Sequence, residues 1–126
     1  LKYPPINLHM SYLPYNKGSH PNFWSFLNGT PKGVTIHEVD KKIDNGKIII
    51  QKKIFFKIDK KISFKYTYDL LFEELEKLFK KNYFKILNRK YKGKKSKLKG
   101  SIHFKKDLKK KIKWSEPIKN HIKLNR

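Results

Sequence analysis

The chain has 126 residues, 37% of them hydrophobic, with a formal net charge of +22 and no cysteine. This length allows one small domain with a modest core, and the lack of cysteine excludes a disulfide framework, a thiolate nucleophile and a cysteine-based zinc site. No apolar run approaches the ~20 residues that a membrane-spanning helix requires, and Pro4-Pro5 interrupts any signal-peptide pattern. We therefore expect a cytoplasmic protein that does not contact a membrane.

The positive charge comes almost wholly from lysine and is concentrated after residue 51. Arginine occurs only at Arg89 and Arg126, whereas nucleic-acid sites favour arginine because its planar fork binds phosphate and guanine through two hydrogen bonds. Lys, Ile, Asn, Phe and Tyr are abundant together, which is the composition that an AT-rich coding sequence produces. A solvated lysine surface is the first interpretation. A field that steers an anionic substrate is the second.

The first third of the chain predicts a strand, a loop and a short helix. Residues 6–9 are apolar at alternate positions and indicate the end of a buried strand. Residues 10–19 contain several turn formers and indicate a loop. Pro21 suits the first turn of a helix, which we expect to end at Asn28-Gly29.

The middle of the chain predicts two paired strands followed by one amphipathic helix. Residues 33–39 alternate and are rich in β-branched side chains, and residues 48–56 form the second strand. Leucine and phenylalanine then recur every three to four positions, which predicts a helix that is capped by Thr67 and extends to about Lys81. Residues 91–126 show little pattern and are predicted to be a Lys-rich tail.

Three polar residues are candidates for one site. Asn7 and His9 are two apart on the predicted strand, so their side chains point to the same face. The loop before the second paired strand can bring Asp44 to that face. An asparagine amide can donate to an oxyanion, a neutral histidine can accept a proton, and a carboxylate can orient the histidine.

This trio resembles the catalytic residues of the folate-dependent formyltransferases, which move a formyl group from 10-formyltetrahydrofolate to an amine. The loop Ser11-Tyr12-Leu13-Pro14 with Gly18, and the segments 33–37 and 43–51, also resemble that family, so that the likeness covers roughly residues 5–54. The resemblance implies an α/β fold, the downstream half of a Rossmann-like catalytic domain with a central sheet and flanking helices. Residues 1–90 would be that part of the domain, with the upstream half absent, and 91–126 the tail.

The resemblance also implies a role for each residue. Asn7 would polarise the formyl oxygen, His9 would be the acid and base, and Asp44 would position His9 and assist proton removal. Thr35 and His37 would lie beside His9. The pterin pocket would be lined by the backbone of four consecutive residues, namely Asp40, Lys41, Lys42 and Ile43. No metal-ligand spacing is present, so we predict no metal.

Three acceptor amines are common in the family: glycinamide ribonucleotide, methionyl-tRNA and amino sugars on nucleotide carriers. Residues 21–26, Thr35-Ile36-His37 and residues 100–108 resemble the sugar N-formyltransferases most. We therefore predict a nucleotide-linked amino sugar as acceptor and a possible homodimer. One alternative is a methionyl-tRNA formyltransferase, for which a nucleic acid would be a partner. Another is a non-catalytic, Lys-rich nucleic-acid-binding fragment.

Overall fold

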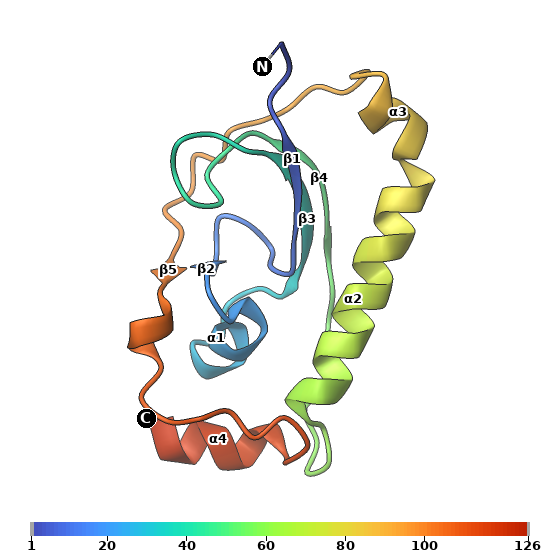
Figure 1. Cartoon of the computed structure of the whole chain (residues 1–126). Helices are drawn as coiled ribbons and strands as arrows, with labels where there is room; N and C mark the ends of the chain where they lie inside the picture. Colours follow the sequence, from blue (N-terminus) through green and yellow to red (C-terminus); the bar gives the residue numbers. More distant parts are fainter. Residues whose placement is uncertain (1, 126) are drawn as a thin grey trace.

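The computed structural model describes residues 2–125, with side chains described as far as residue 122. An antiparallel sheet of three strands forms its centre, in the order β1 (Ile6–His9), β3 (Gly33–Glu38) and β4 (Ile48–Lys53). The helix α2 (Phe64–Lys81) runs along one face of this sheet, and α1 (Pro21–Leu27), β2 (Lys17–Gly18) and β5 (Ile102–His103) lie on the other side (Figure 1). β1 is at one edge of the sheet. The predicted pairing of the two later strands is confirmed.

One face of the sheet is polar because of the register between its strands. β1 pairs with β3 so that Asn7 is opposite His37 and His9 is opposite Thr35. Gln51 of β4 is opposite Thr35 on its other side. Side chains alternate along a strand, so these five polar residues share a face. That face carries the candidate site.

The opposite face holds the main hydrophobic core. Val34 and Ile36 of β3 are fully buried, and Leu71 and Leu75 of α2 pack against them. Their spacing of four places both leucines on one side of the helix. The helix α2 therefore covers the apolar face of the sheet and leaves the opposite, polar face uncovered by this helix.

The helix α2 begins earlier than the sequence predicts. Ser63 is its N-cap, because the Ser63 hydroxyl accepts a hydrogen bond from the backbone N–H of Tyr66 at 3.2 Å. The prediction that Thr67 caps the helix is wrong. Thr67 is fully buried and donates to Asn22 Oδ1 at 2.9 Å, which joins α2 to α1 (Pro21–Leu27).

The second predicted strand is also shorter than expected. β4 ends at Lys53, whereas the sequence predicts strand to residue 56. Ile54 N–H donates to Lys32 O at 2.8 Å, after which the chain turns away from the sheet to reach α2. Phe56 then packs between the two hydrophobic cores instead of continuing the strand.

The downstream part of the chain returns to the sheet after α3 (Tyr83–Leu87). Lys94 forms an isolated antiparallel bridge with Ile48 at the start of β4. β5 (Ile102–His103) then pairs in parallel with β2 (Lys17–Gly18), as Figure 1 shows beside the loop after β1. The domain boundary at residue 90 stays a prediction, but residues past it lie against the first half of the chain.

A second hydrophobic core lies at the end of the molecule where α1 and α4 (Ile118–Asn125) meet. The buried members of this second core come from both halves of the sequence: Phe23, Phe26, Ile62, Phe64, Ile112 and Ile118. A short 3-10 helix (Lys105–Asp107) precedes α4 along the chain.

Across residues 2–125, no helix combines the length and the hydrophobicity needed to cross a membrane.

Candidate active site

The Asp44 carboxylate lies between two imidazoles on the polar face of the sheet. Its Oδ2 is 3.7 Å from His9 Nδ1, and its Oδ1 is 3.6 Å from His37 Nε2. His9 ends β1, His37 is on β3, and Asp44 belongs to the connection from β3 to β4. Asp44 has a φ of +47°, in the left-handed region that Asp and Asn tolerate better than most residues. The structure therefore brings His9 and Asp44 together.

Asp44 is ionised at neutral pH. Burial acts to raise its pKa, but His37, His9 in its protonated form and the backbone N–H of Gly18 outweigh burial and lower the Asp44 pKa to about 2. The Gly18 N–H donates to Oδ2 at 2.8 Å. A fixed negative charge therefore lies beside both rings.

The two histidines differ in basicity. Burial lowers the pKa of His9, despite the nearby charge of Asp44, so this ring is neutral at pH 7. Burial acts in the same direction on His37, but the Asp44 carboxylate and the Glu38 backbone carbonyl raise its pKa overall. His37 Nδ1 donates to Glu38 O at 2.9 Å, which leaves Nε2 facing Asp44. The sequence places His37 beside His9, and the structure adds its contact with Asp44.

The tautomer of His9 follows from a backbone contact. His9 Nε2 lies 3.0 Å from the carbonyl oxygen of Asn16. A carbonyl only accepts hydrogen bonds, so Nε2 carries the proton when the ring is neutral. The unprotonated Nδ1 then faces Asp44, and a proton taken up at Nδ1 would be stabilised by that carboxylate.

Asn7 is exposed on the same face of β1. It is the backbone partner of His37, two residues before His9, so its amide points to the same side of the sheet. The structure thus places Asn7 on the face that carries His9, with Asn7 open to solvent and the His9 and Asp44 side chains enclosed.

Thr35 and Gln51 hold the loop after β1 in place, a role that the sequence analysis missed. The Thr35 hydroxyl donates to Ser11 O at 2.7 Å and accepts from the Leu13 N–H at 3.2 Å. Gln51 Nε2 donates to Leu13 O at 3.1 Å and to Thr35 Oγ1 at 3.2 Å. The signal was present in the sequence, since Thr35 lies between Val34 and Ile36, and Gln51 directly follows the apolar run 48–50.

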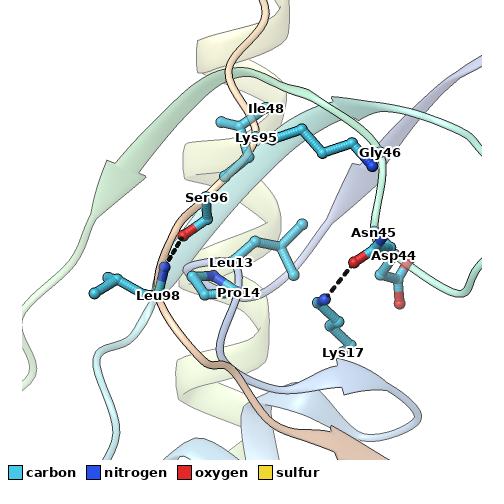
Figure 2. Close-up of a pocket in the computed structure, with 10 residues that line it drawn as sticks. All are labelled: Leu13, Pro14, Lys17, Asp44, Asn45, Gly46, Ile48, Lys95, Ser96 and Leu98. Carbon is cyan, nitrogen blue, oxygen red and sulfur yellow. Dashed lines mark hydrogen bonds between the residues drawn. The ribbon is translucent and has the colours of Figure 1, made fainter.

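A small cavity of about 90 Å³ opens beside Asp44. Figure 2 shows Asp44 and Asn45 on one side of it, with Lys95, Ser96 and Leu98 of the returning chain opposite. The downstream segment therefore supplies one wall of the site.

A larger cavity of about 460 Å³ shares Lys17 and Asn45 with the first. Its other lining residues come from two segments: Lys41, Lys42 and Ile43, and Gly100, Ser101 and Ile102. Three of the four residues predicted for the pterin pocket thus share one cavity. Asp40 does not line this cavity. Its carboxylate accepts a hydrogen bond from the Lys42 N–H at 2.9 Å and pairs with Lys95 Nζ at 3.2 Å. In the part of the chain that the structure describes, no three ligating side chains are arranged to hold a metal ion.

Comparison with known proteins identifies the family. Residues 2–80 match the model of the formyl transferase family. This match covers more than half of the sequence, and the chain belongs to the formyl transferase family. The predicted family and the mixed α/β fold with helices flanking a sheet are both confirmed.

Individual relatives are similar over parts of their length. Over 48 residues, 38% of this chain, it is 44% identical to dTDP-4-amino-4,6-dideoxyglucose formyltransferase from Mycobacterium bovis, and the match spans 20% of that protein. Over 58 residues, 43% of this chain, it is 41% identical to methionyl-tRNA formyltransferase from Desulforamulus reducens, and the match spans 18% of that protein.

A solved structure matches nearly the whole chain. It is formyltransferase PseJ from Anoxybacillus kamchatkensis, in complex with UDP-4,6-dideoxy-4-formamido-L-AltNAc and tetrahydrofolate. The TM-score is 0.84 at 38% identity, over 96% of this chain and 66% of that one. The matched region thus spans about a fifth of the mycobacterial relative and 66% of the crystallised protein.

Proposed function

We propose that this chain carries the catalytic side chains of a folate-dependent N-formyltransferase whose acceptor is a nucleotide-linked amino sugar. The observation that carries the proposal is the ionised Asp44 carboxylate, 3.7 Å from the neutral ring of His9, in a chain of the formyl transferase family. A neutral imidazole beside a fixed carboxylate is a general base that is stabilised when it takes up a proton.

The three residues divide the work of formyl transfer. As the acceptor nitrogen bonds to the formyl carbon, that nitrogen must lose a proton and the formyl oxygen gains negative charge. His9 takes up the proton at Nδ1, and Asp44 stabilises the imidazolium that results. The bond from the formyl carbon to the donor nitrogen then breaks, the carbonyl forms again, and the proton held by His9 passes to the departing nitrogen. The Asn7 amide, exposed on the same face, donates to the oxygen.

The cavity lined by Lys41, Lys42 and Ile43 fits a small cosubstrate. Its volume of about 460 Å³ lies within the ~300–1,000 Å³ of ordinary small-molecule sites. We assign Lys41, Lys42 and Ile43, together with the backbone of the adjoining Asp40, to the binding of 10-formyltetrahydrofolate, which supplies the formyl group when bound. The adjoining smaller cavity beside Asp44 is where the acceptor amine would approach.

The choice of a sugar acceptor rests on the relatives. The crystallised formyltransferase that matches 96% of this chain is in complex with a UDP-linked formamido sugar. A methionyl-tRNA formyltransferase is the second candidate, supported by 41% identity over 58 residues.

A cytoplasmic location and a homodimer stay predictions. Cell fractionation would test the location, and light scattering would test the homodimer.

The test uses the full-length protein with 10-formyltetrahydrofolate and each of three acceptors: a UDP- or dTDP-linked amino sugar, methionyl-tRNA and glycinamide ribonucleotide. We expect a mass gain of one formyl group on the amino sugar, lost in His9→Ala and Asp44→Ala. Asp69→Ala is the matched control, since Asp69 is 61% exposed on α2. Formylation of methionyl-tRNA alone would favour the second candidate, and no formylation of any acceptor would overturn the enzymatic assignment.

A further inference from the structure

The peptide unit between Asn16 and Lys17 contacts the site on one side and the downstream chain on the other. Its carbonyl, Asn16 O, lies 3.0 Å from His9 Nε2. Its N–H, that of Lys17, donates to Ser101 O at 2.9 Å. In a trans peptide the C=O and N–H point in opposite directions. Any movement of this unit relative to Ser101 therefore changes the hydrogen bond to His9.

Ser101 holds the neighbouring peptide as well. Its hydroxyl accepts from the Asn16 N–H at 2.9 Å. Asn16 is fully buried, and its φ of +61° lies in the left-handed region. Its side chain donates to Thr30 Oγ1 at 2.8 Å. Two bonds from Ser101 and one to Thr30 thus fix the backbone conformation that aims the Asn16 carbonyl at His9.

The same segment also reaches Asp44. Gly18 N–H donates to Asp44 Oδ2 at 2.8 Å, and Gly18 pairs with His103 in the β2–β5 ladder. A Cβ at Gly18 would lie 2.1 Å from His103 O, so the two chains are in direct contact. Residues 16–18 therefore touch both the imidazole and the carboxylate, and residues 101–103 hold residues 16–18.

We propose that Ser101 is a positioning residue, which fixes the Nε2-protonated tautomer of His9 by clamping the Asn16–Lys17 peptide. Ser101 comes 92 positions after His9 in the sequence, and the sequence analysis uses it only as part of the segment 100–108. The relevance of this clamp to catalysis rests on the proposed function, whereas its effect on His9 does not.

The other groups that face His9 are Asp44 and His37. Asp44 Oδ2 is 3.7 Å from Nδ1, and the His37 ring meets the His9 ring edge-on with centroids 6.2 Å apart. Neither contacts the Ser101 hydroxyl. A substitution at Ser101 therefore alters the Nε2 side of the ring and leaves the charges around it unchanged.

The test measures the His9 ring directly, by long-range 1H–15N NMR of the 126-residue chain, with His9→Gln to assign its signals. In Ser101→Ala we expect the excess of the Nε2-protonated tautomer to fall. We also expect the His9 pKa to fall further, because the hydrogen bond to Asn16 O favours the protonated ring. Ser101→Thr, which keeps a hydroxyl, should restore the wild-type values.

Ser63→Ala is the matched control. It also deletes a serine hydroxyl that accepts a backbone N–H, but at the start of α2, and it should leave the His9 signals unchanged. If Ser101→Ala fails to fold, Ser101→Cys replaces it, since a thiol is a weaker acceptor and should shift His9 in the same direction. A folded Ser101→Ala or Ser101→Cys protein with wild-type His9 tautomer and pKa would overturn the proposal.

A second measurement separates this inference from the proposed function. In the full-length protein, Ser101→Ala should lower kcat for formyl transfer about tenfold or more, as expected of a residue that orients a general base. If the wild-type protein transfers no formyl group, the proposed function fails. The NMR result then still decides whether Ser101 controls His9. Loss of activity with an unchanged His9 ring would count against the clamp.

Discussion

His37 and Asp44 form an ion pair across the junction of β3 and its following loop, with 3.6 Å between His37 Nε2 and Asp44 Oδ1. The pair is enclosed, since the His37 side chain is 2% exposed and that of Asp44 12%. One oxygen of the carboxylate thus serves His37, and the other serves His9 and the Gly18 N–H. His37, which is not the proposed base, therefore helps to stabilise the negative charge of Asp44.

Replacing His37 should make Asp44 harder to ionise. We expect the Asp44 pKa in His37→Gln to rise above its value of about 2, because the His37 ring, 3.6 Å from Asp44 Oδ1, favours the ionised carboxylate. Carboxyl 13C NMR titration measures this directly. The Asp59 pKa, which is lowered by the backbone N–H groups of Lys61 and Ile62, should not change and serves as the internal control. An unchanged Asp44 pKa would contradict the pairing.

The Asp44 carboxylate should make folding sensitive to acid. Its pKa is lowered from 3.8 to about 2 in the folded chain. Its contribution is therefore present above pH 3.8 and lost as the pH falls through about 2. That shift corresponds to on the order of 2 kcal/mol. We expect the difference in unfolding free energy between wild type and Asp44→Asn to shrink over this window, measured by urea denaturation. A difference in unfolding free energy that stays constant over this pH window would contradict the contribution of Asp44.

His37 should show the opposite pH dependence. Its pKa is raised above 6.5 in the folded chain, so its ion pair contributes fully below pH 6.5 and is lost as the pH rises through the raised pKa. The stability advantage of wild type over His37→Gln should be largest near pH 5.5 and decline in alkaline buffer. Urea denaturation between pH 5 and 9 checks this, and an advantage that grows with pH would exclude the assignment.

Two glycines with positive φ offer a matched pair of substitutions. Gly29 has a φ of +64° and nothing within 4 Å of an added Cβ, so Gly29→Ala should cost about 1 kcal/mol through backbone strain alone. At Gly18, with a φ of +88°, the added Cβ would lie 2.1 Å from His103 O. We expect Gly18→Ala to cost at least about 3 kcal/mol by urea denaturation and to separate β2 from β5. Equal costs would contradict the contact.

The core between the sheet and α2 can be tested with two adjacent residues. Leu71 is 1% exposed and Phe72 is 52% exposed. Leu71→Ala should lower the unfolding free energy by about 2–5 kcal/mol because it leaves a cavity against β3. Phe72→Ala should change it by less than about 1 kcal/mol. Similar losses for both variants would show that α2 packs with another face.

The sequence predicts what depends on local periodicity and on short motifs. The strand 6–9, the pairing of β3 with β4 and the existence of α2 follow from alternation and from the three-to-four spacing of leucines. Asn7 and His9 share a face because a strand alternates, and Asp44 joins them because a short connection precedes β4. Family likeness over residues 5–54 adds the chemistry.

Sequence reasoning fails where distant segments decide the structure. Ser101 and Asn16 have no common motif and meet only after the chain has passed along α2 and returned. The N-cap of α2 is displaced from Thr67 to Ser63 because Phe64 joins the core beneath α1, which brings an extra turn into the helix. The basicity of His37 depends on burial and on the direction of its ring, and neither is visible in residue order.

The position of β1 at the rim of the sheet affects any work on the isolated polypeptide. Over residues 2–125, β1 has a strand on one flank only, and backbone N–H and C=O groups along its free flank can accept another strand. Leu8 of β1 is also 38% exposed. Self-association through the free edge of β1 should rise with protein concentration. Measurements on the 126-residue chain therefore need dilute samples and sedimentation controls.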